Sequence, residues 1–392
     1  MERNDPRYQA YVEILKEELI PAMGCTEPIA LAYAAAKARE VLGVLPDSVQ
    51  LQVSGSIIKN VKSVIVPNTG HLKGMEAAVA AGIIAGSAEK ELEVISEVSE
   101  EKKSAIRDYL QTVPITIEHT EQGHVFDIVV TERCGQDYAR VRIADYHTNI
   151  CRIEKNGTVL YEVPLLDETV QADARADRSL LNMQDIWDFA ETADLRDVAD
   201  LLERQIRYNN AIAEEGLLGD YGANIGRVLL TTYGNDVSNR AKAKAAAGSD
   251  ARMNGCELPV IINSGSGNQG ITCSVPLIEY AKELHSGKEK LYRALIISNL
   301  VAIHEKTGIG TLSAYCGAVS AGAGAGAGIV YLCGDGYQAA IHTVVNALAI
   351  VSGIVCDGAK ASCAAKIASS VDAALLGYNM YKCNQEFKGG DG

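Results

Sequence analysis

The segment from Leu312 to Cys356 constrains the fold of this chain most, because its only formally charged residue is Asp335. Most of its apolar residues are alanine or glycine, as in the run 318–328, and few are Leu, Ile or Phe. Side chains this small contribute too little transfer free energy for membrane insertion, but they let helices approach each other closely. We therefore predict a tightly packed, buried helical bundle here rather than membrane spans.

The overall composition is that of a folded protein with little affinity for polyanions. Of the 392 residues, 22% are charged and 47% are hydrophobic, and the formal net charge is −14. A surface this acidic repels the phosphates of nucleic acids and anionic membranes. We expect neither nucleic acid nor a membrane as a partner. The sequence leaves the oligomeric state open, with a homodimer as one alternative.

The chain contains ten cysteines, and its first residues, Met1–Tyr8, lack the apolar run of a secretory signal. This combination favours the cytoplasm as the location of the protein. Cysteines in that compartment are more often thiols, metal ligands or catalysts than disulfides.

Hydrophobic periodicity divides the chain into three parts. Helical spacing extends over residues 8–43 with a break near residues 21–28, period-two runs occupy residues 49–163, and helical patterns return after residue 182. We predict an α+β fold, in which residues 1–45 and 182–392 form a mostly helical domain and residues 46–181 form an inserted α+β domain with a largely antiparallel sheet. The predicted strands are 49–53, 116–118, 125–130 and 138–143, with a hairpin turn at Asn156–Gly157, and the predicted helices include 73–89, 99–110 and 185–208.

The first candidate site is the motif Gly24-Cys25-Thr26-Glu27-Pro28, at the predicted entry turn of a helix. Pro28 suits a first helical turn, and the residues after it are strong helix formers. Free backbone N–H groups and the helix dipole favour a thiolate at such a position, so we expect a lowered pKa for Cys25. Glu27 has a simpler alternative role as a first-turn acid that stabilises the helix.

A second candidate is the loop from Asn263 to Gly270, which precedes a predicted helix over residues 271–284. Its glycines permit close backbone approach, and its Ser, Asn and Gln side chains supply hydrogen-bond donors and acceptors. Backbone N–H groups at the helix start could hold a carboxylate. An ordinary loop with an N-cap explains the same pattern equally well.

A third candidate is the set Cys316, Cys356 and Cys363, which are 40 and 7 residues apart. None of the pairs is CxxC, so the spacing fits neither a zinc ribbon nor a bacterial ferredoxin. Cys356 and Cys363 flank a predicted turn and could converge. Buried cysteines are often small hydrophobic packing residues, so the spacing alone does not decide their role.

Taken together, these motifs resemble those of the iron–sulfur-dependent L-cysteine desulfidases, within the superfamily related to the serine dehydratase α chain. They are Gly-Cys25-Thr-Glu-Pro, Ser-Gly267-Asn-Gln-Gly, Cys316-Gly-Ala and the segment from Cys356 to Cys363. The motifs occur in the order of that family, and the resemblance extends over nearly the whole chain, from near residue 25 to about residue 374.

The resemblance implies that Cys316, Cys356 and Cys363 ligate three irons of a [4Fe–4S] cluster whose fourth iron is an open Lewis acid. It implies β-elimination of L-cysteine, a small amino-acid substrate, to hydrogen sulfide, ammonia and pyruvate. Cys25 would be either the general base, which its helix-start position favours, or a resting ligand of the open iron. The residues expected to bind substrate are Thr26, Glu27, Asn60, Ser264, Gly265, Ser266, Gly267, Asn268 and Gln269.

Three other functions remain as alternatives. The same site could act on L-serine and release hydroxide. The Ser-Gly-Asn-Gln-Gly loop is also similar to the substrate loop of pyridoxal-phosphate lyases, but those enzymes need an alternating α/β chain, which the helical pattern here does not provide. A non-catalytic iron–sulfur sensor is the third, although no DNA-binding segment accompanies the cysteines.

Overall fold

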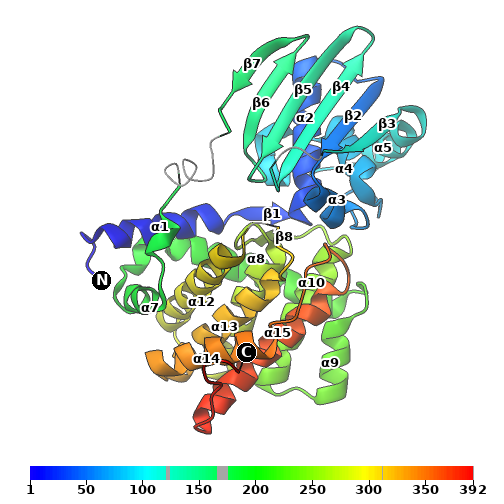
Figure 1. Cartoon of the computed structure of the whole chain (residues 1–392). Coiled ribbons are helices and arrows are strands. Elements are labelled where there is room, and N and C mark those ends of the chain that lie inside the picture. Colours follow the sequence, from blue (N-terminus) through cyan, green and yellow to red (C-terminus); the bar gives the residue numbers. More distant parts are fainter. Residues whose placement is uncertain (121–123, 166–174, 311, 392) are drawn as a thin grey trace.

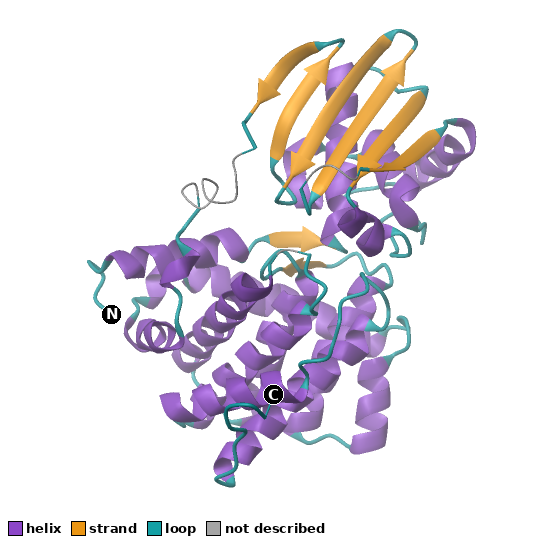
Figure 2. Cartoon of the chain, in the orientation of Figure 1, coloured by secondary structure: helices purple, strands orange, loops and turns teal. Residues whose placement is uncertain are grey.

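The computed structural model describes residues 1–120, 124–165, 175–310 and 312–391. It has an upper part with a sheet and helices and a lower part of helices (Figures 1 and 2). This arrangement confirms the predicted α+β fold and its largely antiparallel sheet. The inserted domain predicted at residues 46–181 includes residues 166–174, which lie outside the described part of the chain.

The upper part contains a six-stranded sheet in the order β3-β2-β4-β5-β6-β7, in which only the β2–β3 pair is parallel. Successive side chains of a strand point to opposite faces of the sheet, and in β2 those of Val49, Leu51 and Val53 lie on the buried face while the residues between them are less buried. Asn156 and Gly157 both have positive φ and form the predicted hairpin turn. The strands are β2 (Ser48–Val53), β3 (Ile115–His119), β4 (Asp127–Cys134), β5 (Asp137–Ala144), β6 (Ile150–Lys155) and β7 (Thr158–Glu162).

Helix α2 contacts β4, β5 and β6 and packs closely on α4. Gly82 makes this approach possible, because a Cβ there would lie 2.1 Å from the carbonyl oxygen of Ala32. The predicted boundary at residue 45 placed this helix in the helical domain, but it packs on the sheet, so the chain crosses between the parts just before it. The helices here are α2 (Thr26–Leu42), α3 (Gly55–Val61), α4 (Gly74–Ala85), η1 (Ala88–Glu93) and α5 (Glu100–Thr112).

The lower part is a bundle around the alanine- and glycine-rich α13, which contacts α11, α12, α14 and α15 (Figure 1). Nearly all of α13 is buried, which confirms the predicted packed bundle. No helix in the described part of the chain has both the length and the apolarity to cross a membrane. The helices are α8 (Ala199–Leu218), α9 (Ile225–Tyr233), α10 (Val237–Met253), α11 (Gly267–Glu283), α12 (Lys288–Ile309), α13 (Gly317–Cys333), α14 (Tyr337–Ile350) and α15 (Cys363–Lys382).

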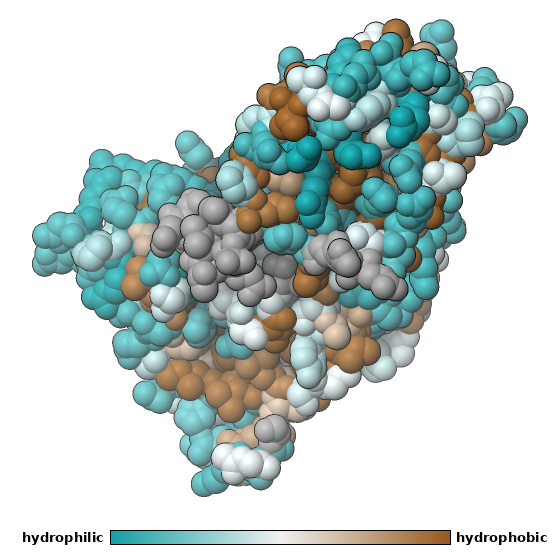
Figure 3. Space-filling view, turned by 45° about the horizontal axis from the view of Figure 1, so that its top comes forward, coloured by the Kyte–Doolittle hydropathy of each residue, from teal (hydrophilic) through white to brown (hydrophobic). Residues whose placement is uncertain are grey.

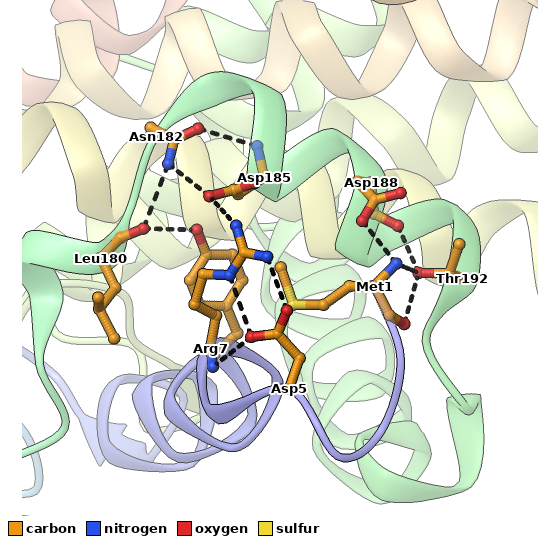
Figure 4. A network of polar contacts seen from close by, with 9 residues as sticks. Met1, Asp5, Arg7, Leu180, Asn182, Asp185, Asp188 and Thr192 are labelled. Atoms are coloured by element: carbon orange, nitrogen blue, oxygen red, sulfur yellow. Dashed lines mark hydrogen bonds and ion pairs between the residues drawn. The ribbon is translucent and has the colours of Figure 1, made fainter.

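Hydrogen bonds and ion pairs connect the N-terminal helix α1 (Pro6–Glu18) to α7 (Met183–Thr192) of the same bundle (Figure 4). Arg7 forms ion pairs with Asp5 and with Asp185 of α7, at 2.6 and 2.9 Å. The single helix predicted over 185–208 is wrong, because α7 ends at Thr192 and α8 begins at Ala199. Asp194 accepts a hydrogen bond from the backbone of Arg196 between them and starts the short helix η4 (Leu195–Asp197) instead, with η3 (Arg178–Leu180) preceding α7.

A short antiparallel ribbon joins the two parts. Strand β1 (Pro21–Met23) pairs with β8 (Pro259–Ile261), and Pro21 lies opposite Ile261. The segments that follow the two strands leave the ribbon at opposite ends, and a hydrogen bond from Thr26 to the carbonyl oxygen of Gly265 brings the Cys25 motif to the Asn263–Gly270 loop. Hydrophilic residues predominate on much of the surface seen in Figure 3, in keeping with the net charge of −14.

Candidate active site

A cavity of about 810 Å³ lies where the helical and α+β parts meet. Its walls come from both ends of the chain and from the sheet domain. Every predicted site residue except Gly267 lines it, namely Cys25, Thr26, Glu27, Asn60, Ser264, Gly265, Ser266, Asn268, Gln269, Cys316, Cys356 and Cys363. Segments far apart in the sequence are thus brought to one site.

Glu27 is the centre of a buried hydrogen-bond network on the floor of this cavity. One carboxylate oxygen accepts hydrogen bonds from the Cys25 thiol at 3.1 Å and the Thr26 hydroxyl at 3.2 Å. The other accepts one from the Asn60 side-chain amide at 2.8 Å. Thr26 also contacts the carbonyl oxygen of Gly265 at 3.0 Å, so the network links the Cys25 motif to the second loop.

Cys25 is the N-cap of α2, as predicted, but its expected low pKa is wrong. Burial raises the pKa of this thiol well above its usual value, and the charge of Glu27 raises it further. These two effects outweigh the helix start and the nearby guanidinium of Arg252. Burial also opposes ionisation of Glu27, but His147 and the hydrogen bonds from Cys25 and Asn60 prevail and lower the pKa of that carboxyl. The pair therefore consists of a thiol donating to a carboxylate.

His147 reaches the same site from the turn between β5 and β6. Its ring packs edge-on against Phe126, with the centroids 4.7 Å apart, and a Cβ on Gly265 would lie 3.1 Å from it. Burial lowers the pKa of His147, although the carboxylate of Glu27 opposes that shift. The α+β part thus supplies a wall of the cavity rather than a separate site.

The second loop turns sharply before helix α11. Ser264 and Gly265 both have positive φ, and α11 begins at Gly267, four residues earlier than predicted. The side chain of Gln269 lies against Gly317, where a Cβ would be 2.6 Å from it. The glycine beside Cys316 therefore lets the second loop approach the cysteine segment.

The three late cysteines come from two hydrogen-bonded backbone segments. Cys316 donates its backbone N–H to Ile354 at 3.2 Å, and Cys356 donates to Ala314 at 2.6 Å. Cys363 begins helix α15 and faces the same cavity. Burial raises the pKa of Cys316 and of Cys363, and the charge of Cys356 adds to both shifts.

The turn between Cys356 and Cys363 contacts the α+β part. Gly358 has φ of 106° and lies so close to α3 that a Cβ would be 2.2 Å from the carbonyl oxygen of Lys59. Only glycine fits this conformation and this contact. Because Asn60 follows Lys59, the cysteine turn and the Glu27 network are held next to each other.

The three late cysteines supply the type of donor atom that an iron–sulfur cluster uses. All ten cysteines are free, and the three late ones are partly accessible from the cavity. Among the described residues, no group of three or more His, Cys, Asp or Glu side chains is placed to hold one ion. Cysteine thiolates are the ligands that such clusters use.

Several polar atoms in the cavity wall are buried without a hydrogen-bond partner. They are Asn60 Oδ1, His147 Nε2, Arg252 Nε, Asn268 Oδ1 and Gln269 Oε1. Buried polar groups are normally paired, so these atoms indicate a site built for a polar ligand. Sequence reasoning missed Arg252 and His147, since a basic residue in a last helical turn and a lone loop histidine carry no distinguishing signal.

Comparison of the sequence with known protein families identifies the family of this chain. The family model of the serine dehydratase alpha chain matches residues 89–390. The chain belongs to this family. The serine dehydratase alpha-chain family is one of lyase-type, iron–sulfur-dependent enzymes, which agrees with thiols on the wall of a cavity.

Close relatives of this family member cover essentially the same length. A UPF0597 protein of Desulfitobacterium hafniense is 62% identical over all of this chain and 91% of its own length. UPF0597 proteins of Lachnoclostridium phytofermentans and Treponema denticola are 53% and 47% identical, over 98% and 100% of this chain and 92% of their own lengths.

Proposed function

We propose that this family member is an L-cysteine desulfidase, which eliminates sulfide from L-cysteine and releases pyruvate and ammonia. One observation carries the proposal, namely that Cys316, Cys356 and Cys363 share a cavity with the Cys25–Glu27 pair and with buried polar atoms that lack partners. Metal-ligand thiols, a proton-transfer pair and a polar binding wall are the three components that such an elimination needs.

Cys316, Cys356 and Cys363 would hold a [4Fe–4S] cluster. When bound, the cluster would supply a Lewis acid with an affinity for sulfur, which stabilises the departing thiolate of the substrate. The chain itself holds the substrate so that its Cα–H bond faces a base.

Cys25 and Glu27 would move the Cα proton. The Cys25 thiol is hydrogen-bonded to Glu27, so it can pass its own proton to that carboxylate in the same step in which its sulfur accepts the proton from Cα. The electron pair of the Cα–H bond forms the Cα–Cβ double bond as the Cβ–S bond breaks. The enamine product tautomerises, and water hydrolyses it to pyruvate and ammonia. Cys25 has the alternative role of a resting ligand to the open iron.

L-Serine is a second candidate substrate, which the family name favours. It has the same carboxylate and ammonium groups, and hydroxide would leave in place of sulfide. An iron centre held by the three late cysteines would bind a thiol more readily than an alcohol, which favours L-cysteine.

The direct test is product formation by protein purified without oxygen. We expect equal amounts of sulfide and pyruvate from L-cysteine, and a lower kcat/KM for pyruvate formation from L-serine. A higher kcat/KM for L-serine would reassign the protein to the second candidate. If neither amino acid gives pyruvate while the iron is intact, the proposal is wrong.

A further inference from the structure

Arg252 is the buried cation of the cavity. It belongs to the last turn of α10, its residue is 3% exposed, and its guanidinium lines the cavity wall. Within the described part of the chain it makes no hydrogen bond and no ion pair, and its Nε is buried without a partner. A buried charge is costly unless it is paired, so this arginine indicates an anion that enters the cavity.

The surroundings of Arg252 place this anion at the start of helix α11. Gly267 is the first residue of that helix, and a Cβ there would lie 2.3 Å from Nε of Arg252. The absence of a side chain at Gly267 thus leaves the guanidinium against the helix N-terminus. Ser266, the N-cap, makes no side-chain capping bond, so the partial positive charge of the first N–H groups of α11 adds to that of the guanidinium.

The neighbouring wall has the opposite polarity. Asn268 Oδ1, Gln269 Oε1 and Asn60 Oδ1 are hydrogen-bond acceptors that are buried without partners in the same cavity. Acceptors suit an ammonium group, whereas a guanidinium suits a carboxylate. The two walls together match a small zwitterion.

We propose that Arg252 binds the α-carboxylate of the amino-acid substrate and so selects for substrates with a free carboxylate. Naming that ligand an α-amino acid rests on the proposed function. The planar guanidinium can donate two parallel hydrogen bonds to the carboxylate oxygens, which fixes the orientation of Cα relative to Cys25. Gly267 is then a positioning residue, because a larger side chain would displace the guanidinium.

Balancing the negative charge of iron-bound thiolates is a different role for the same cation. The charge of Arg252 opposes the rise in the pKa of Cys363 and of Cys25, so it reaches both thiols. The two roles differ in what they predict. A charge-balancing arginine affects iron content and the visible spectrum, whereas a carboxylate-binding arginine affects only ligands that carry a carboxylate.

Binding of unreactive ligands separates these roles without relying on turnover. We would titrate anaerobically purified, iron-containing protein with L-alanine, whose methyl group cannot leave, and with L-alaninamide, which lacks the carboxylate charge. The proteins are wild type, Arg252→Gln, Arg252→Lys, and Arg240→Gln as a matched control. Arg240 lies on the same helix but pairs with Glu283 near the surface.

Wild type should bind L-alanine more tightly than L-alaninamide. Arg252→Gln should weaken L-alanine binding on the order of 100-fold, the loss expected for a charge-assisted pair, and leave L-alaninamide binding and iron content unchanged. Arg252→Lys should lose about tenfold, because an ammonium cannot form two parallel bonds. Arg240→Gln should match wild type.

Two results would overturn the proposal. One is wild-type protein that binds both ligands equally. The other is an Arg252→Lys protein with wild-type affinity for L-alanine, a variant that stays informative even if Arg252→Gln does not fold. Carboxylate binding that depends on Arg252, in a protein that forms no pyruvate, would contradict the proposed function and leave this inference standing.

Discussion

At the scale of single residues, the surroundings of the Cys25 side chain determine its protonation state more than its position at a helix start does. Cys25 does occupy a helix start, where an exposed thiol would ionise readily. Its residue is only 2% exposed, however, and it lies 3.1 Å from a carboxylate. Desolvation and the like charge therefore act against the thiolate. The residue type and its place were predictable from the sequence, but its protonation state depended on a contact with Glu27 that only the fold reveals.

Cys25→Ala tests the role of that thiol. If Cys25 is the base, we expect pyruvate formation to fall on the order of 10³-fold, within the range for a lost proton-transfer group, with iron content equal to wild type. Iron analysis and a sulfide assay on the same anaerobic preparation check this. Loss of iron from the variant would contradict the base assignment and favour a ligand role.

At the scale of elements, small residues determine how closely helices approach. In α13, a Cβ on Gly324 would lie 2.4 Å from the carbonyl oxygen of Ser298 on α12. The packed bundle could be predicted, since an uncharged alanine–glycine segment has few other stable arrangements. The pairing of helices could not, because residues 322–328 alternate glycine and alanine and so mark no unique partner.

Gly324→Ala should destabilise the protein by about 1–3 kcal/mol, since one extra methyl group must push two backbones apart. Unfolding by denaturant measures this. Gly308→Ala on α12 is the matched control, because nothing lies within 4 Å of its Cβ. There the same substitution should stabilise by about 0.5–1 kcal/mol. Equal effects at both positions would contradict the packing argument.

Helix α10 carries a buried acid, Asp250, near the start of α9. Burial raises its pKa from 3.8 to about 6, although the backbone N–H groups of Ile225 and Gly226 oppose the shift. A carboxyl group whose pKa is raised in the folded state favours folding while it is protonated. That contribution is present below about pH 4 and is lost as the pH rises through about 6.

Asp250→Asn should therefore remove part of the pH dependence of stability. Between pH 4 and pH 7, the free energy of unfolding of wild type should fall by about 2–2.5 kcal/mol relative to the variant. Denaturant titrations at both pH values provide the comparison. Parallel behaviour of the two proteins would show that Asp250 ionises normally.

At the scale of the whole molecule, the cavity exists because both chain ends and the sheet domain meet. The class of fold and most strands of the six-stranded sheet followed from periodicity, and the convergence of the motifs followed from the family resemblance, whereas β1 and β8 were not predicted. Arg252 and His147 were not, since each reaches the site through tertiary packing: Arg252 from the last turn of α10 and His147 from a turn of the sheet domain. The same meeting of domains places Gly358 on Lys59 and thereby holds the cysteine turn next to Asn60.

Iron and acid-labile sulfide content is the most direct test of the shared cysteine site. In anaerobically reconstituted wild type we expect about four irons and four sulfides per chain, as a [4Fe–4S] cluster requires. Cys316→Ser, Cys356→Ser and Cys363→Ser should each lose most of both, whereas Cys134→Ser, at the end of β4, should retain them. Full iron and sulfide content in all three variants would contradict the claim that these cysteines hold the cluster.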